Sequence, residues 1–75
     1  MSTLAIQTSE TLGVLLKELG EECSKTLKLL SQIEVEELTH EQLAGILSEL
    51  AVSAVHLHAH TDGLQDIIND EIEKL

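Results

Sequence analysis

The chain has 75 residues, of which 14 are Asp or Glu and only four are Lys, so its formal net charge is −10. A surface this acidic repels phosphate backbones and anionic lipid headgroups, so we expect neither a nucleic-acid nor a membrane partner. No apolar run reaches the roughly 18 residues that a membrane-spanning helix needs. The first residues lack the basic segment of a signal peptide, and we expect a cytoplasmic protein.

The composition limits how this chain can build a core. Residues 1–75 are enough for a single domain, and a domain of this size buries little of its surface without a disulfide, a metal or association with another chain. Cys23 is the only cysteine, so no disulfide can form within the chain. There is no aromatic residue and no proline, which favours helices that interdigitate Leu, Ile, Val and Ala. The sequence therefore predicts an all-α protein.

The first predicted helix covers about residues 9–33, with Thr8 or Ser9 as its N-cap. Apolar or small residues recur at alternating spacings of four and three, which is a heptad pattern. The predicted seam is Leu12, Leu16, Leu19, Cys23, Thr26, Leu30 and Ile33. Leu15, Leu27 and Leu29 widen it into a face typical of a bundle with more than two helices.

A turn is predicted over residues 34–39, and a second helix over about 40–74. Thr39 and Gln42 have the spacing of a capping box, in which each side chain binds the other residue's backbone N–H. Leu38 before the cap and Leu43 after it fit a hydrophobic staple. These signals predict that a helix begins at His40.

The second helix carries its own predicted seam, which passes through a turn dipeptide. The seam residues are Leu43, Leu47, Leu50, Ala54, Leu57, Thr61, Leu64, Ile68 and Leu75. Asp62-Gly63 is typical of a turn, and Asp62 with Gln65 could cap a new helix. Because the heptad phase continues through Gly63, we favour one continuous helix, and a bend or a break at 62–63 is the alternative.

A short connection makes the two helices antiparallel neighbours. The second helix is longer than the first, so its end needs cover from Leu4 and Ile6 or from another chain. The middle of the second helix, 51–59, has no formal charge and apolar residues on several sides. We expect a homodimer that forms a four-helix bundle. The predicted interface residues are Leu50, Ala54, Val55, Leu57, Leu64, Ile67, Ile68 and Ile72.

Three histidines lie close together in the second helix. His56 and His60 are one turn apart and share a side, a geometry that can chelate Zn, Cu or Ni, whereas His58 points elsewhere. Two ligands do not complete a site. The sequence more strongly favours structural histidines beside the seam, and a metal site at His56 and His60 is an alternative. We predict no bound cofactor.

No arrangement of residues predicts catalysis. The carboxylates fit solvated helix faces, and a narrow hairpin offers no cleft that would shift their pKa values. We therefore expect a non-enzymatic protein-interaction module, such as a small acidic regulator, adaptor, inhibitor or chaperone, that uses an apolar helix face. A basic protein is a second expected partner, and an acidic mimic of nucleic acid is a further alternative.

Overall fold

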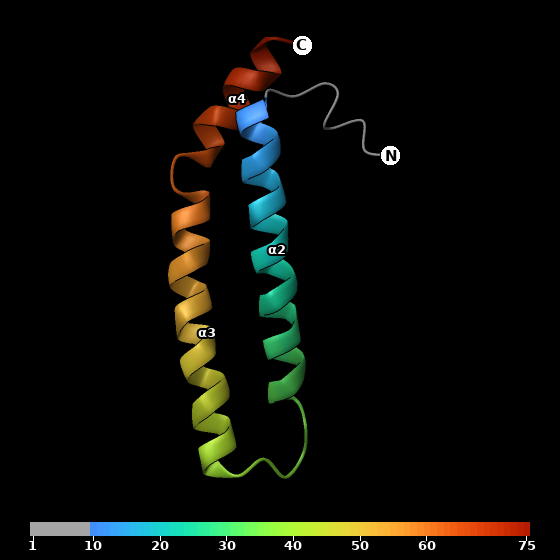
Figure 1. The fold of residues 1–75 in the computed structure, drawn as a ribbon, viewed down its shortest axis with the longest axis vertical. Helices are drawn as coiled ribbons and strands as arrows, with labels where there is room; N and C mark the ends of the chain where they lie inside the picture. Colours follow the sequence, from blue (N-terminus) through green and yellow to red (C-terminus); the bar gives the residue numbers. More distant parts are fainter. Residues whose placement is uncertain (1–9) are drawn as a thin grey trace.

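The computed structural model describes residues 10–75, and over that range the chain forms three helices and no strand. Helix α2 spans Glu10–Ile33, α3 spans His40–Thr61 and α4 spans Leu64–Glu73. Figure 1 shows α2 and α3 side by side and antiparallel, with α4 across the open end of the hairpin. The expected all-α helical hairpin is confirmed.

Helix α2, Glu10–Ile33, ends at the predicted residue, and residue 9, the predicted start, lies outside the described residues. The proposed N-cap at Thr8 or Ser9 lies outside the described residues. The same is true of the proposed cover by Leu4 and Ile6.

The connection between α2 and α3 ends in the predicted capping box. Thr39 Oγ1 accepts a hydrogen bond of 3.0 Å from the Gln42 backbone N–H, and Gln42 Oε1 accepts one of 2.9 Å from the Thr39 backbone N–H. These two bonds satisfy backbone donors that the first turn of α3 would otherwise leave unpaired, and α3 therefore begins at His40. Within the connection Glu37 adopts a left-handed conformation with φ of 64°.

The second helix is interrupted at 62–63, where the sequence left a break open. Helix α3 ends at Thr61, and Gly63 adopts φ of 74°, the left-handed region that a helix cannot continue through. Asp62 is extended, and its N–H closes the last turn by donating to His58 O at 2.9 Å. Gly63, rather than Asp62, is the N-cap of α4. The heptad spacing was an unreliable guide here because it records only which residues are apolar and not the backbone angles between them.

The break folds the end of the chain back over the hairpin. Leu64 is only 5% exposed, and Ile67 and Ile68 are half-buried. A continuous helix would have carried these side chains beyond the end of α2. The chain thus covers its own open end, which removes part of the argument that another chain must do so.

The two helices of the hairpin pack through a heptad stripe one residue away from the predicted one. Leu12, Leu29, Ile46 and Ser53 are buried, whereas Leu30, Leu47 and Ala54 of the predicted seam are exposed. The packed stripes, spaced by three and four, are Leu12, Leu15, Leu19, Glu22, Thr26, Leu29 and Ile33 in α2, and Leu43, Ile46, Leu50, Ser53, Leu57 and His60 in α3. Every second member of each packed stripe also belongs to the predicted seam, and at the other positions the predicted seam has the next residue along the chain.

The hairpin is thin. The molecule extends 51 × 26 × 14 Å, so apart from α4 it is one layer of helices. Two helices in one layer leave both broad faces of the hairpin open to solvent. Of the described helices, none combines the length and the apolar character needed to cross a membrane.

The left-handed glycine gives a test of the break. We expect Gly63→Ala to lower the free energy of unfolding by about 1 kcal/mol, because a Cβ is strained at positive φ. Gly45→Ala is the matched control: Gly45 is helical and a Cβ there meets nothing within 4 Å, so this change is expected to stabilise by up to about 1 kcal/mol. Urea unfolding at one fixed protein concentration measures both. Equal stabilisation by the two changes would contradict a left-handed break at Gly63.

Candidate functional site

A carboxylate lies between the two helices at the middle of the hairpin. Glu22 occupies a position in the packed stripe of α2, and its side chain is only 10% exposed. Its neighbour Cys23, which the sequence placed in the seam, is exposed instead. A carboxylate in a seam of leucines must be hydrogen-bonded to offset its lost hydration, so its partners explain how the hairpin tolerates it.

Both partners of this carboxylate come from α3. Ser53 Oγ donates to Glu22 Oε2 at 3.1 Å, and His56 Nδ1 lies 3.3 Å from Glu22 Oε1. Ser53 is 1% exposed, whereas the His56 side chain is 49% exposed. Ser53 and His56 are three residues apart in α3 and so lie on one side of it, where the two oxygens of Glu22 reach them. We name these three residues the polar cluster.

The polar cluster contains a serine, a histidine and an acid, but its connectivity differs from that of a catalytic triad. In a triad the hydroxyl donates to the histidine and the acid holds the other ring nitrogen. Here the Ser53 hydroxyl donates directly to Glu22, so its proton goes to the acid. Because Ser53 is 1% exposed, a substrate cannot approach its oxygen. The geometry fits a structural link between α2 and α3.

The histidines are distributed around α3. His56 meets Glu22, His60 is half-buried in the packed stripe, and His58 is exposed on another side. Within residues 10–75, no group of three or more His, Cys, Asp or Glu side chains lies close enough to hold a metal ion. The pair His56 and His60 therefore gains no third ligand from the described part of the chain.

One broad face of the hairpin carries no Asp, Glu or Lys along either helix. Successive residues of a helix are about 100° apart, so the residue that follows a packed position lies beside the packed stripe. In an antiparallel pair, the residues that follow the packed positions lie on the same face in both helices. We name this surface the uncharged face. Its members are Leu16, Gly20, Cys23, Leu27 and Leu30 of α2, and Leu47, Ala51, Ala54 and His58 of α3. Large apolar side chains on it are well exposed, with Leu27 at 64%, Leu30 at 45% and Leu47 at 48%.

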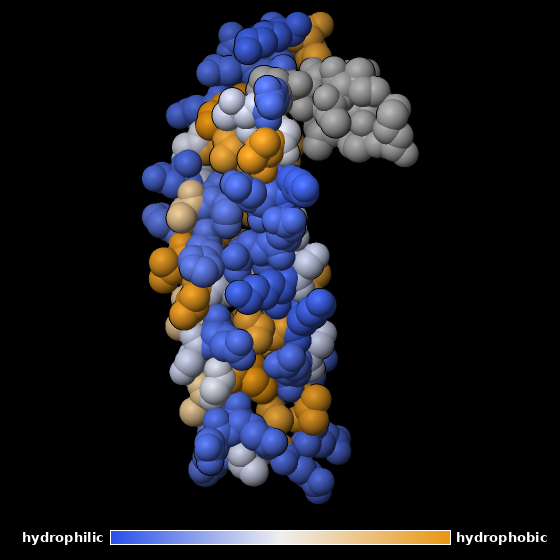
Figure 2. Space-filling model, viewed as in Figure 1, coloured by the Kyte–Doolittle hydropathy of each residue, from blue (hydrophilic) through white to orange (hydrophobic). Residues whose placement is uncertain are grey.

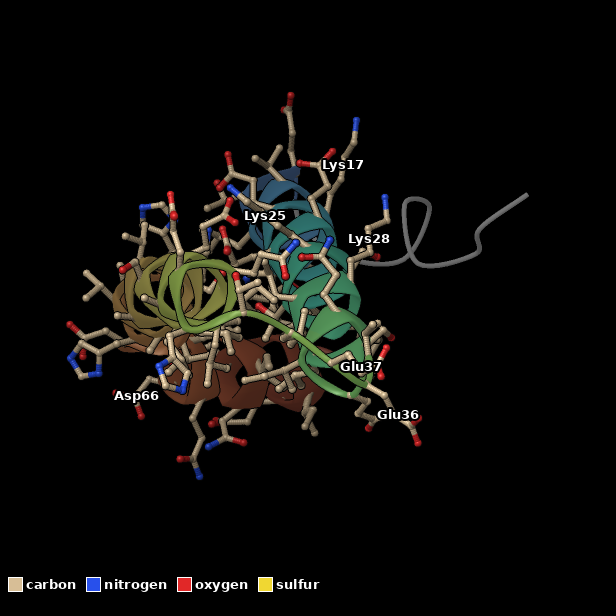
Figure 3. The ribbon with its side chains drawn as sticks, turned by 90° about the horizontal axis from the view of Figure 1, so that it is seen from below. Lys17, Lys25, Lys28, Glu36, Glu37 and Asp66 are labelled. Carbon is tan, nitrogen blue, oxygen red and sulfur yellow. The ribbon has the colours of Figure 1, made fainter. Side chains whose placement is uncertain are left out.

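The opposite face of the hairpin carries the charges of the two helices. Lys17, Lys25 and Lys28 project on this side, away from α4, as Figure 3 shows. Figure 2 views the same side, where hydrophilic side chains cover much of the surface and hydrophobic ones show in the lower half and along the left edge. Acidic residues of α2 lie between the lysines in the sequence, so charges of both signs alternate there. The linear sequence alone did not show that the hairpin is divided into a charged and an uncharged face.

Helix α4 lies on the side of the uncharged face. Seen along the hairpin in Figure 3, α4 crosses below α2 and α3, opposite the labelled lysines, and Asp66 points outward from it. It covers the face only at the open end of the hairpin (Figure 1). The rest of the uncharged face, toward the connection between α2 and α3, has no cover from residues 10–75.

The predicted interface residues divide into three groups. Leu64 is buried within the chain, and four others are half-buried in the packing between helices: Leu50, Leu57, Ile67 and Ile68. Val55 and Ile72 are 67% and 58% exposed, and Ala54 is exposed on the uncharged face. The sequence interpretation left out the contribution of α2. The signal was present, since Leu16, Cys23 and Leu30 keep heptad spacing beside the stripe that packs.

Comparison of the chain with protein-family models, with curated proteins and with solved structures finds no match.

The polar cluster gives a second test. We expect Ser53→Ala to lower the free energy of unfolding by about 1–2 kcal/mol, because Glu22 Oε2 then loses its donor in a nearly buried place. The double substitution Glu22→Leu with Ser53→Ala removes both the donor and the acceptor of this hydrogen bond, and it should restore or exceed the original stability. Ser48→Ala, at an exposed position of α3, controls for the higher helix propensity of alanine. If Ser53→Ala and Ser48→Ala behave alike, the hydrogen bond does not support the hairpin.

Proposed function

We propose that this protein is a non-enzymatic interaction module that works through the uncharged face, and that its first partner is a second copy of the chain. Two hairpins packed face to face form a homodimeric four-helix bundle. The observation that carries the proposal is the exposed apolar stripe next to the packed one, with Leu27, Leu30 and Leu47 among its members. Apolar residues that recur at spacings of three, four and seven, and that cover two adjacent sides of a helix, are typical of a helix that contacts more than one neighbour.

The charge of the chain favours the same surface. Two copies that each carry −10 repel one another, and the repulsion is least where neither contributes a charge to the contact. The uncharged face is such a surface on α2 and α3. Ala51, Ala54 and Gly20 on it are small, which lets the backbones of facing helices approach closely.

The charge distribution gives less support to the other expected interactions, with a basic protein or with a protein's nucleic-acid binding site. A basic protein or a nucleic-acid binding site would pair with a continuous acidic surface. On the charged face of the hairpin Lys17, Lys25 and Lys28 stand among the acidic residues of α2 and partly neutralise them. The proposal therefore places the primary contact on apolar packing and leaves the charged face to keep the assembly dispersed.

A matched pair of substitutions in α3 tests the proposal. Leu47 and Val52 are 48% and 51% exposed in the same helix, but Leu47 lies on the uncharged face and Val52 does not. We expect the unmodified chain to be a dimer by light scattering across a dilution series. Leu47→Glu should raise the dissociation constant at least tenfold, since a carboxylate loses hydration in the interface, at a cost of about 1–3 kcal/mol.

Val52→Glu adds the same charge to the other side and should leave the dimer nearly unchanged. A helical monomer at every concentration would contradict self-association, and would mean that residues 1–9 or a different protein covers the face. Equal weakening by both substitutions would show that net charge, rather than this face, controls association.

A further inference from the structure

The position of α4 bears on how two copies can meet. It rests on the same side of the hairpin as the uncharged face and occupies only the open end (Figures 1 and 3). A helix with its side chains is about 10–12 Å across. The uncharged face is thus raised at one end by α4 and flat from there to the connection at residues 34–39.

Two arrangements bring uncharged faces together under a two-fold axis. In a parallel arrangement the axis runs along the helices, and both open ends lie at the same end of the assembly. The two α4 helices would then meet over the same part of the interface and hold the hairpins apart. Leu27 and Leu30, near the connection, would be left without contacts.

In an antiparallel arrangement the axis crosses the helices. Each α4 then lies beside the connection end of the other hairpin, where there is no second α4 to displace. The flat parts of the two faces come into contact, with Cys23 and Leu27 of each α2 and Ala51 and Ala54 of each α3 near the axis. This arrangement brings apolar side chains of the two chains together over the whole flat part.

We infer that the chain pairs with a second copy antiparallel, uncharged face to uncharged face, with α4 of each copy seated against the connection end of its partner. The inference rests on the proposed function and adds to it the direction of pairing and a role for α4. Both ends also carry acidic residues, so the contact between them depends on exposed apolar ones: Ile72 and Leu75 at the end with α4 are 58% and 84% exposed, and Val35 in the connection is 58% exposed. Helix α4 is then a positioning element that selects the direction of pairing.

The direction of pairing can be measured by energy transfer between dyes on full-length chains. On a Cys23→Ser background, Glu36→Cys places a dye in the connection and Lys74→Cys places one just beyond α4, both at exposed positions. One sample mixes donor and acceptor both on Glu36→Cys. The other mixes donor on Glu36→Cys with acceptor on Lys74→Cys, and light scattering on each sample shows whether it is dimeric.

Antiparallel pairing separates the two connections by about 30 Å or more and brings each connection near the partner's α4, from the 1.5 Å rise per helical residue. We therefore expect transfer between positions 36 and 74 to be at least about twofold higher than between the two positions 36. A dimer with the opposite ranking would overturn the antiparallel inference alone. Monomers without transfer in either sample would overturn the proposed function and the inference with it.

Discussion

The hairpin depends on how one carboxylate is held between its two helices. Glu22 sits where a seam of leucines would take another apolar residue, and the hydroxyl of Ser53 and the ring of His56 meet its two oxygens. Since a nearly buried acid without donors is costly, α2 and α3 are held in the register that lets these groups meet. A shift by one heptad would remove Glu22 from both partners. The apolar residues supply most of the attraction between the helices, and the polar cluster selects one register among several similar ones.

That register also decides which apolar residues stay exposed. Turning each helix so that Glu22 and Ser53 face one another places Leu29 and Ile46 inside the hairpin, and moves Leu30 and Leu47 to the uncharged face. The exposed stripe and the polar cluster thus go together with one orientation of the two helices. A hairpin built on the more apolar seam would have hidden Leu30 and Leu47 and would have left less surface for a partner.

The sequence was a good guide wherever the signal is local. The capping box of Thr39 and Gln42 identified the start of α3 to the residue, because two side-chain hydrogen bonds within four residues fix it. Local signals do not decide which of two adjacent heptad stripes packs between α2 and α3. Apolarity favoured Cys23 and Ala54 over Glu22 and Ser53, and only the pairing of the last two across 31 residues reverses that preference. The break at Gly63 could not be decided for a related reason: the apolar pattern continues through it, whereas the backbone turns into the left-handed region there.

The same limit explains why the structure leaves a different surface open from the one that the sequence suggests. Leu64 was expected to be exposed because a straight helix would carry it past the end of α2, but the turn at Gly63 brings it back and buries it. The need for a partner then moves from the end of the second helix to the face of the hairpin. There the thin, single-layer shape matters most. Two helices alone cannot enclose a stripe that covers two sides of each, and a chain without aromatic side chains has no large ring to cover the remaining side. A second layer of helices is the simplest structure that buries both stripes, and in the proposed dimer a copy of the chain provides it through the face that carries no charged residue of α2 or α3.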